Sequence, residues 1–313
     1  MQKATQTLNA IMDNVSKVVI GKQHIVRLAM ISIISNGHVL IEDIPGVGKT
    51  SLVSGFAKSI DLSFKRIQFT PDVTPSDVVG FSMYNPKTME FEYKKGAVLN
   101  QFVQADEINR TSSKTQASLL EVMEEQQVTV DGNTYKAPSP FIVFATQNPM
   151  EHVGTYPLPE SQLDRFFMCI SLGYPSLNDE ANILLNQNAE HAADVISSVS
   201  TAEEILRIQT LVKNNYIAPE VAAYVVRIAD ATRNHPDISL GASPRASIHL
   251  CKAAKACAIL NGRNYVIPDD VQSMTMPVLS HRIIIKKHAS SKNINTEAVL
   301  AQILKALPVP IPR

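Results

Sequence analysis

At 313 residues the chain exceeds the commonest size of a single domain, which suggests two domains of unequal length. A hydrophobic content of 45% and a charged content of 19% are ordinary for a globular protein. Lys+Arg 29 balance Asp+Glu 29, so no overall field attracts the chain to nucleic acid or to an anionic membrane. These values argue against a disordered or strongly basic protein.

The three cysteines, Cys169, Cys251 and Cys257, have no metal-binding spacing, and an odd number cannot be fully paired in one chain. Buried, reduced thiols are expected, as in a reducing compartment. The N-terminal residues lack the apolar core of a signal peptide. Nowhere do about 18 apolar residues run uninterrupted, so no membrane span is expected. The sequence therefore predicts a cytoplasmic protein.

In the first half of the chain, helical apolar spacing alternates with short apolar runs. This alternation predicts a parallel α/β sheet. The expected elements, in chain order, are a helix over 22–36, a strand at His38–Glu42, a helix at Thr50–Ile60, strands at Phe64–Phe69 and Gln101–Ala105, a helix at Lys114–Glu125 and a strand at Phe141–Ala145.

Two segments interrupt the alternation, and both are predicted to be β-hairpins. Phe81–Tyr93 has two aromatic-rich arms around an Asn-Pro turn, and Gln127–Tyr135 alternates around Asp-Gly, a strong hairpin signal. Beyond Pro175 helical patterns dominate as far as Leu307, followed by an extended, Pro-rich tail. We therefore expect an α/β domain over residues 1–175 and a smaller all-α domain over 176–313.

The segment Asp43-Ile-Pro-Gly-Val-Gly-Lys-Thr50 lies between an expected strand and an expected helix. Such a loop wraps phosphates with backbone N–H groups, and it supplies a lysine for the β- and γ-phosphates and a hydroxyl for Mg²⁺. Asp43 stands where the usual first glycine would be, and a chance Gly-Lys-Thr is the alternative interpretation. The context favours a site for Mg·ATP. The predicted nucleotide contacts here are Pro45, Gly46, Val47, Gly48, Lys49, Thr50 and Ser51.

A second acidic feature follows the strand expected at Gln101–Ala105, where Asp106 and Glu107 stand side by side. In P-loop ATPases an acidic residue at a strand end orders the Mg²⁺ shell, and a neighbouring carboxylate can activate the attacking water. Adjacent side chains on an extended segment point in opposite directions, so the two can face different parts of one site. We predict Asp106 with Thr50 on the metal side and Glu107 as the general base.

Several motifs in the same order resemble the MoxR family of AAA+ ATPases. The resemblance covers nearly the whole chain and implies an AAA+ P-loop domain with β-hairpin insertions and a helical lid. A residue other than glycine at Asp43 is common in that family. The matching segments are Gly37–Thr50, Asp106–Arg110, Gln116–Glu125, Ala145–Pro149, Leu158–Phe166 and Gly241–Arg245.

The resemblance also implies roles for three polar residues. Asn148 matches the sensor-one residue that places the attacking water; a turn asparagine is the alternative. Arg165 matches the arginine finger presented to a neighbouring subunit's nucleotide, with an ion pair to Asp164 as the alternative. Arg245 matches the sensor-two arginine of the lid, which touches the γ-phosphate, and a capping or surface arginine is its alternative.

By the same resemblance, Val19, Ile20 and Gly21 belong to the segment whose backbone holds adenine, although a core strand is also compatible with their sequence. Arg110 and Glu121 match family positions without an assigned role. The two hairpins correspond to the helix-two insert and to the hairpin before sensor one, which face the pore or the top of a ring.

The implied function is an ATP hydrolase that forms a ring, typically a hexamer, and remodels or matures client proteins. Such clients receive a metal or cofactor and often carry a von Willebrand A domain. Three other functions are compatible with the sequence: a nucleotide-gated scaffold, a magnesium-chelatase-like subunit and a nucleic-acid motor. The neutral charge and the scarcity of aromatic residues argue against nucleic acid as the partner.

Overall fold

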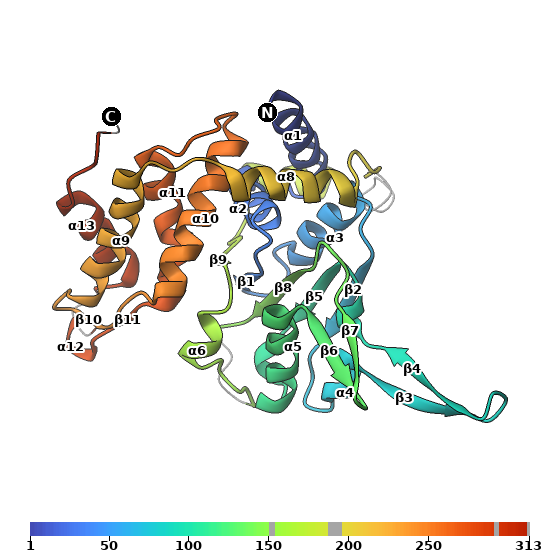
Figure 1. Cartoon of the computed structure of the whole chain (residues 1–313). Coiled ribbons are helices and arrows are strands. Elements are labelled where there is room, and N and C mark those ends of the chain that lie inside the picture. The colour runs from blue at the N-terminus through green and yellow to red at the C-terminus, as the bar shows by residue number, and fades with distance from the viewer. Residues whose placement is uncertain (150–153, 187–195, 291–293, 312–313) are drawn as a thin grey trace.

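The computed structural model of the chain describes residues 1–149, 154–186, 196–290 and 294–311. Its centre is a five-stranded sheet in the order β2-β5-β8-β1-β9, and all four pairings are parallel (Figure 1). The predicted parallel α/β class is confirmed. The strands are β1 (Val39–Glu42), β2 (Phe64–Gln68), β5 (Phe102–Asp106), β8 (Ile142–Gln147) and β9 (Met168–Ile170).

Helices cover both faces of this sheet, as the nearly continuous apolar runs of its central strands require. Val39 and Ile41 of β1 belong to one apolar cluster, and Leu40 between them belongs to the other. The first cluster includes residues of three helices before β2, and the second includes residues of the helix after β5. The helices of this half are α1 (Gln2–Ser16), α2 (Gln23–Ile34), α3 (Lys49–Ser59), α4 (Pro75–Val79), α5 (Ser113–Glu125) and α6 (Glu160–Leu163), with short 3-10 turns at Ala97–Leu99 and Ile108–Arg110.

The two predicted hairpins are both present. β3 (Gly80–Asn85) pairs antiparallel with β4 (Glu90–Lys95), and this hairpin extends away from the body of the molecule (Figure 1). β6 (Gln127–Val130) pairs antiparallel with β7 (Asn133–Lys136). Asp131 and Gly132 form the turn between these two with positive φ values of 49° and 79°, as the Asp-Gly signal predicts.

The described part of the chain after β9 is helical apart from one short antiparallel strand pair and an isolated bridge between Tyr216 and Tyr265. Its C-terminal residues up to Ile311 continue beyond the last helix without regular structure, and residues 312–313 of the predicted tail lie outside the described part. The elements are α7 (Leu177–Asn186), α8 (Ala202–Asn214), α9 (Pro219–Arg233), β10 (Ile238–Leu240), α10 (Pro244–Leu260), α11 (Pro268–Leu279), a 3-10 turn at Ser280–Arg282, β11 (Ile284–Ile285), α12 (Lys287–Ser290) and α13 (Thr296–Ala306).

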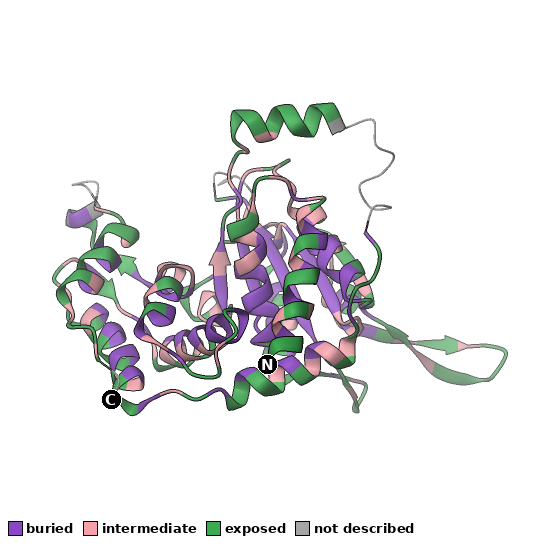
Figure 2. Ribbon diagram, turned by 90° about the horizontal axis from the view of Figure 1, so that it is seen from above, coloured by how far each residue is buried: buried purple, intermediate pink, exposed green. Residues whose placement is uncertain are grey.

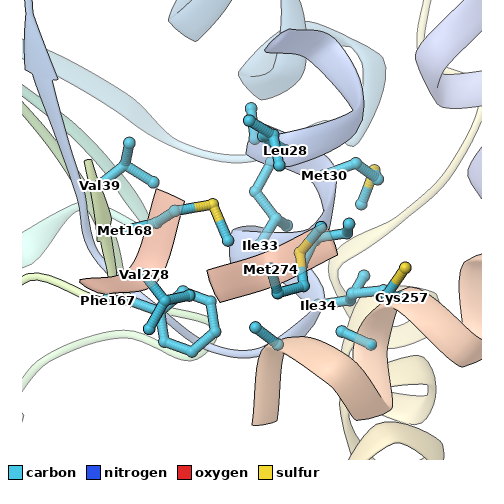
Figure 3. Packing of buried hydrophobic residues seen from close by; sticks show 14 of the residues in the cluster. Leu28, Met30, Ile33, Ile34, Val39, Phe167, Met168, Cys257, Met274 and Val278 are labelled. Carbon is cyan, nitrogen blue, oxygen red and sulfur yellow. The ribbon is translucent and has the colours of Figure 1, made fainter. Parts of the chain in front are cut away.

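Helix α2 joins the two halves. Figure 3 shows Ile33 of α2 between Met168 of β9 and Met274 of α11, and all three are buried in the larger apolar cluster. That cluster continues from the sheet into α9, α10, α11 and α13. The sheet and the helical region therefore share a core, and a domain boundary near residue 175 stays a prediction.

The sequence did not predict the helices α1, α4 and α6 or the strands β9, β10 and β11. In α1 the buried residues Ala4, Leu8, Ile11 and Val15 are diluted by polar neighbours. The three strands have two or three residues each, too few to show a periodic pattern. Among the described residues, no helix combines the length and the apolar character needed to cross a membrane.

Candidate nucleotide site and arginine pocket

The phosphate loop connects β1 to the N-terminus of α3. Gly46 and Gly48 have φ values of +84° and +94°, and a side chain at either position would meet open space. Glycine is thus favoured here by backbone conformation rather than by crowding. Lys49 Nζ donates to the carbonyl oxygens of Asp43, at 3.0 Å, and Ile44, at 3.2 Å. The lysine amine therefore lies across the hollow of the loop, where phosphate oxygens would bind.

Asp43 anchors this loop to the segment after β9. Its side chain is buried, and Oδ2 accepts hydrogen bonds from the backbone N–H groups of Leu172 and Gly173, the latter at 2.9 Å. Oδ1 accepts from Ile44 N at 3.0 Å. The φ value of Asp43 is not positive, so its conformation does not require glycine. The departure from the usual loop consensus therefore has a structural explanation.

The predicted metal side of the site is held together by one amide. Gln104 Nε2 donates to Thr50 Oγ1 at 3.0 Å and to both carboxylate oxygens of Asp106, at 2.9 and 3.0 Å. A hydroxyl and a buried carboxylate that meet in this way fit Mg²⁺, which takes few protein oxygens and completes its shell with phosphate and water. No group of three or more His, Cys, Asp or Glu side chains suited to a metal occurs in the described part of the chain.

Asp106 has two further partners. Thr146 Oγ1 donates to its Oδ1 at 3.2 Å, and Arg66 Nε forms an ion pair with its Oδ2 at 2.6 Å. Arg66 extends from β2, the strand next to β5, and its side chain is half exposed. The carboxylate on the predicted metal side is therefore already neutralised by a cation of the protein.

Glu107 lies beside Asp106 in the same cavity, but not because the two residues alternate along an extended strand, as predicted. Strand β5 ends at Asp106, and Glu107 has a left-handed conformation with φ 55°. Alternation along a strand therefore does not apply to this residue. Its carboxylate accepts from Gln68 Nε2 at 2.8 Å and pairs with Arg110 Nε at 3.1 Å. Arg110, which had no assigned role, thus holds the predicted base.

One cavity of about 250 Å³ collects most of the predicted nucleotide residues. Asn148, buried at the end of β8, also lines it, as expected of a residue that places water. Val47 instead packs partly against the apolar core. The residues that line the cavity are Pro45, Gly46, Gly48, Lys49, Thr50, Ser51, Arg66, Gln68, Asp106, Glu107, Thr146 and Asn148.

The two predicted arginines lie together in a separate pocket. Glu124 of α5 pairs with Arg165 Nη1 at 3.3 Å through one carboxylate oxygen and with Arg245 Nη2 through the other. Both arginines line this pocket, and neither lines the phosphate cavity. The structure therefore does not bring Arg245 to the phosphate loop of its own chain, since the start of α10 lies against α5.

The alternative prediction, an ion pair between Arg165 and Asp164, is wrong. Asp164 pairs instead with the buried Arg282 at 2.9 Å and accepts a hydrogen bond from Ser243 Oγ. His249 also lines the arginine pocket, and burial, followed by the nearby charge of Arg282, lowers its pKa to about 2. His249 is therefore neutral at neutral pH, and the positive charge of the pocket comes from its arginines and a lysine.

The predicted adenine segment is not a core strand, because residues 17–21 form turns after α1. Val19 is buried, Ile20 is partly buried, and Gly21 is exposed with φ +75°. Lys22 Nζ donates to the carbonyl oxygen of Tyr174 at 2.7 Å, which holds this segment against the chain between β9 and α7. Adenine binding here stays a prediction.

A phosphate loop, an acidic strand end and a helical lid on this sheet define an ATPase of the AAA class. Residues 38–168 match the ATPase family associated with various cellular activities (AAA), and residues 230–303 match the AAA lid domain. The chain belongs to the MoxR family of AAA+ ATPases, because it is 39% identical to "Chaperone MoxR1" of Mycobacterium tuberculosis over 97% of this chain and 82% of that protein.

Two further similarities extend over nearly the whole chain. A Bacillus subtilis protein, YeaC, is 48% identical over 98% of this chain and 96% of its own length. A crystal structure from Cytophaga hutchinsonii, described as a candidate ATPase, superposes with a TM-score of 0.92 at 37% identity, covering 99% of this chain and 97% of that one. The AAA+ fold with a helical lid is therefore confirmed.

Several polar residues of the two sites were missed by the sequence interpretation. They come from neighbouring strands or from a distant helix, so they form no contiguous motif. Arg66 and Gln68 share β2, and their alternation with buried or half-buried residues was the only available signal. The missed residues are Arg66, Gln68, Gln104, Glu124 and Thr146.

Proposed function

We propose that this MoxR-family chain hydrolyses Mg·ATP in a ring of identical subunits and uses the energy to remodel client proteins. The observation that carries the proposal is the separation of two sets of residues. Lys49, Thr50, Asp106 and Glu107 line one cavity, whereas Arg165 and the lid arginine line another. A complete site then requires two copies of the chain.

Within one copy, the phosphate cavity supplies what binding and water activation need. Lys49 and the loop N–H groups would hold the phosphates, and Glu107 would accept the proton of the attacking water while Asn148 positions that water. Magnesium, held by Thr50 and Asp106, would neutralise charge on the β- and γ-phosphates. These residues include no arginine. The arginine that faces the γ-phosphate would have to come from a neighbouring chain.

The arginine pocket provides this missing charge. We place both Arg165 and Arg245 against the nucleotide of the adjacent subunit, because Glu124 binds the two guanidinium groups to one carboxylate. An arginine delivered in this way can contribute about 10³–10⁵ to the rate. An isolated subunit should therefore hydrolyse ATP slowly.

A mixing experiment tests the shared site. Lys49→Ala should prevent ATP binding, and Arg165→Ala should retain binding but lose turnover, so neither chain alone is active. A mixture should regain part of the activity, because a neighbour with Arg165 can complete a subunit with Lys49. Steady-state phosphate release over a range of mixing ratios measures this. A mixture whose turnover is no greater than the sum of the two inactive variants would contradict a shared site. Lys58→Ala, which replaces an exposed lysine on α3, is the control.

The β3–β4 hairpin is the best candidate for client contact. It exposes large apolar side chains on both strands, including Phe81, Met83, Tyr84 and Phe91, the last 74% exposed. Exposed apolar patches of this kind mark protein interaction sites. We infer that clients, including proteins with von Willebrand A domains, bind this hairpin. Pull-down with a Glu107→Gln chain and ATP, with and without Phe91→Ser, tests that inference.

The proposal also places the protein in the cytoplasm, where its three free cysteines would remain reduced. A hexamer is the assembly that the family suggests. Native mass spectrometry with ATP and Mg²⁺ would give the subunit number directly. A stable monomer at all concentrations would contradict a ring.

A further inference from the structure

Helix α7 presents an apolar face that the described part of its own chain does not cover. Leu177, Ala181, Leu184 and Leu185 share one side of the helix at helical spacing. All four are exposed, Leu177 by 88% and Leu185 by 77%. Figure 2 shows α7, the helix that leads into the grey trace of 187–195, standing off the body with exposed residues along its length. Such a stripe on an isolated helix indicates a missing partner.

A groove with a matching apolar surface lies between α8, α9 and α10. Its cavity volume is about 750 Å³, three times that of the phosphate cavity, and its lining is mostly apolar. Val226 and Ile248 are 55% and 57% exposed in the groove, and Cys251 lies beside them. The groove is therefore large enough for several aliphatic side chains, and it is bounded by regular helices.

The charges of the groove and of the helix are complementary. Lys213, Lys252 and Lys255 line the groove, and no aspartate or glutamate is among its described lining residues. Helix α7 carries two acidic residues, Asp179 and Glu180, and no basic residue. An acidic amphipathic helix fits this groove better than a basic or neutral one.

The positions of the two surfaces match those of the two halves of the nucleotide site. The groove shares Ser35, Asn36 and Lys252 with the arginine pocket, so the two hollows are contiguous. Helix α7 begins four residues after Gly173, whose N–H is bound to Asp43 of the phosphate loop. Turning the arginine pocket of one copy toward the phosphate loop of the next therefore brings the groove toward α7 of that next copy.

The two surfaces also lie on opposite sides of one molecule. Helix α8 crosses the front of the view in Figure 1, and α7 lies on the opposite side when the molecule is seen from above in Figure 2. A contact between opposite, non-identical surfaces is heterologous, and repeating it generates a ring or a filament. This is the symmetry that a site shared around a ring requires.

We propose that helix α7 of one copy binds in the groove between α8, α9 and α10 of the neighbouring copy, as part of the ring interface. The leucine stripe would enter the apolar floor, and the acidic first turn would lie near the lysines. This proposal rests on the shared nucleotide site for its orientation, but its contacts involve none of the residues that hold the nucleotide.

Two substitutions at exposed positions test the contact. Leu184→Asp on α7 and Ile248→Asp in the groove should each raise the dissociation constant between subunits by about ten-fold or more, because each places a charge in an apolar interface. Sedimentation velocity with Mg²⁺ and a non-hydrolysable ATP analogue measures assembly. Asn182→Asp, off the leucine stripe of α7, is the matched control, and circular dichroism checks folding.

Mixing the two variants gives the decisive result. Each alone lacks one half of the contact, but a mixture retains one intact pairing, the groove of the Leu184→Asp chain with α7 of the Ile248→Asp chain. The mixture should form dimers that neither variant forms alone. Assembly of either variant at the affinity of the unchanged chain, or a mixture that remains monomeric, would overturn the proposal.

Crosslinking supplies an independent measurement. Leu184→Cys should be joined by a short bismaleimide to Cys251 of the neighbouring copy, giving covalent dimers and larger species that disappear with Cys251→Ser. Crosslinking that is unaffected by Cys251→Ser, or confined within one chain, would overturn the docking. The Lys49→Ala and Arg165→Ala mixture tests the shared site separately, since it reports turnover. Failure of the α7 contact can therefore be told apart from failure of the shared nucleotide site.

Discussion

Arg66 Nε lies 2.6 Å from Asp106 Oδ2, so the carboxylate on the predicted metal side of the site is paired with a cation of its own chain. Asp106 is buried, and Arg66 is half exposed and lines the phosphate cavity. Binding of Mg²⁺ at Asp106 would compete with this ion pair. The guanidinium would then be available to the phosphates beside it.

Arg66→Ala should therefore slow turnover by roughly ten- to a hundred-fold, because a positive charge near the developing charge of the γ-phosphate is lost. Metal binding should not weaken, since a competing cation has been removed from Asp106. Steady-state hydrolysis at saturating ATP, titrated with Mg²⁺, separates the two effects. Lys65→Ala, at the neighbouring exposed position of β2, is the control. An unchanged kcat would exclude a role for Arg66 in catalysis.

Glu107→Gln should lower hydrolysis by about 10²–10⁴, the usual contribution of a general base, with ATP affinity close to that of the unchanged chain. The substitution retains the size of the side chain and an acceptor for Gln68 and Arg110, which hold the carboxylate now. Single-turnover hydrolysis and equilibrium binding of a fluorescent ATP measure the two quantities. Glu125→Gln, at an exposed position of α5, controls for loss of charge. Normal hydrolysis by Glu107→Gln would show that Glu107 is not the general base.

Asp43→Ala should destabilise the fold by roughly 1–3 kcal/mol, because the buried backbone N–H of Leu172 and the partly buried N–H of Gly173 lose their acceptor. The apparent affinity for ATP should fall as well, since the same carboxylate sets the start of the phosphate loop. Urea unfolding and ATP titration measure both. Asp43→Asn retains one acceptor oxygen, so its stability should lie between that of the unchanged chain and that of Asp43→Ala. Equal stability of all three chains would contradict the anchoring role of Asp43.

The phosphate loop and the acidic strand end could be predicted because each is contiguous in sequence and flanked by periodic elements. Asp43 could be identified as a departure from the consensus, but its partners are 129 and 130 residues away. Likewise, Glu124 meets Arg165 and Arg245 only through tertiary packing. Spacing could not reveal that the two arginines share a pocket. Strand β9 was missed because three residues carry no measurable alternation.

Stability should fall with acidification through the buried histidines, of which His38 has the clearest geometry. Its Nδ1 accepts from Val143 N at 3.0 Å, and its Nε2 donates to the carbonyl oxygen of Met123 at 3.1 Å. This arrangement requires the neutral ring. Burial lowers the pKa of His38 from 6.5 to about 4, with the bond to Met123 opposing the shift. Above pH 6.5 the ring is neutral in both the folded and the unfolded chain.

As the pH falls from 6.5 toward 4, the unfolded chain takes up a proton at His38 that the folded chain excludes. The free energy of unfolding should therefore decrease across this window, by at most about 3 kcal/mol from this residue. His38→Gln, which can retain a donor and an acceptor, should show a shallower decrease even though it is less stable at pH 7. Urea unfolding at several pH values measures the slopes, with the exposed His24→Gln as control. Equal slopes for all three chains would contradict a neutral, buried His38.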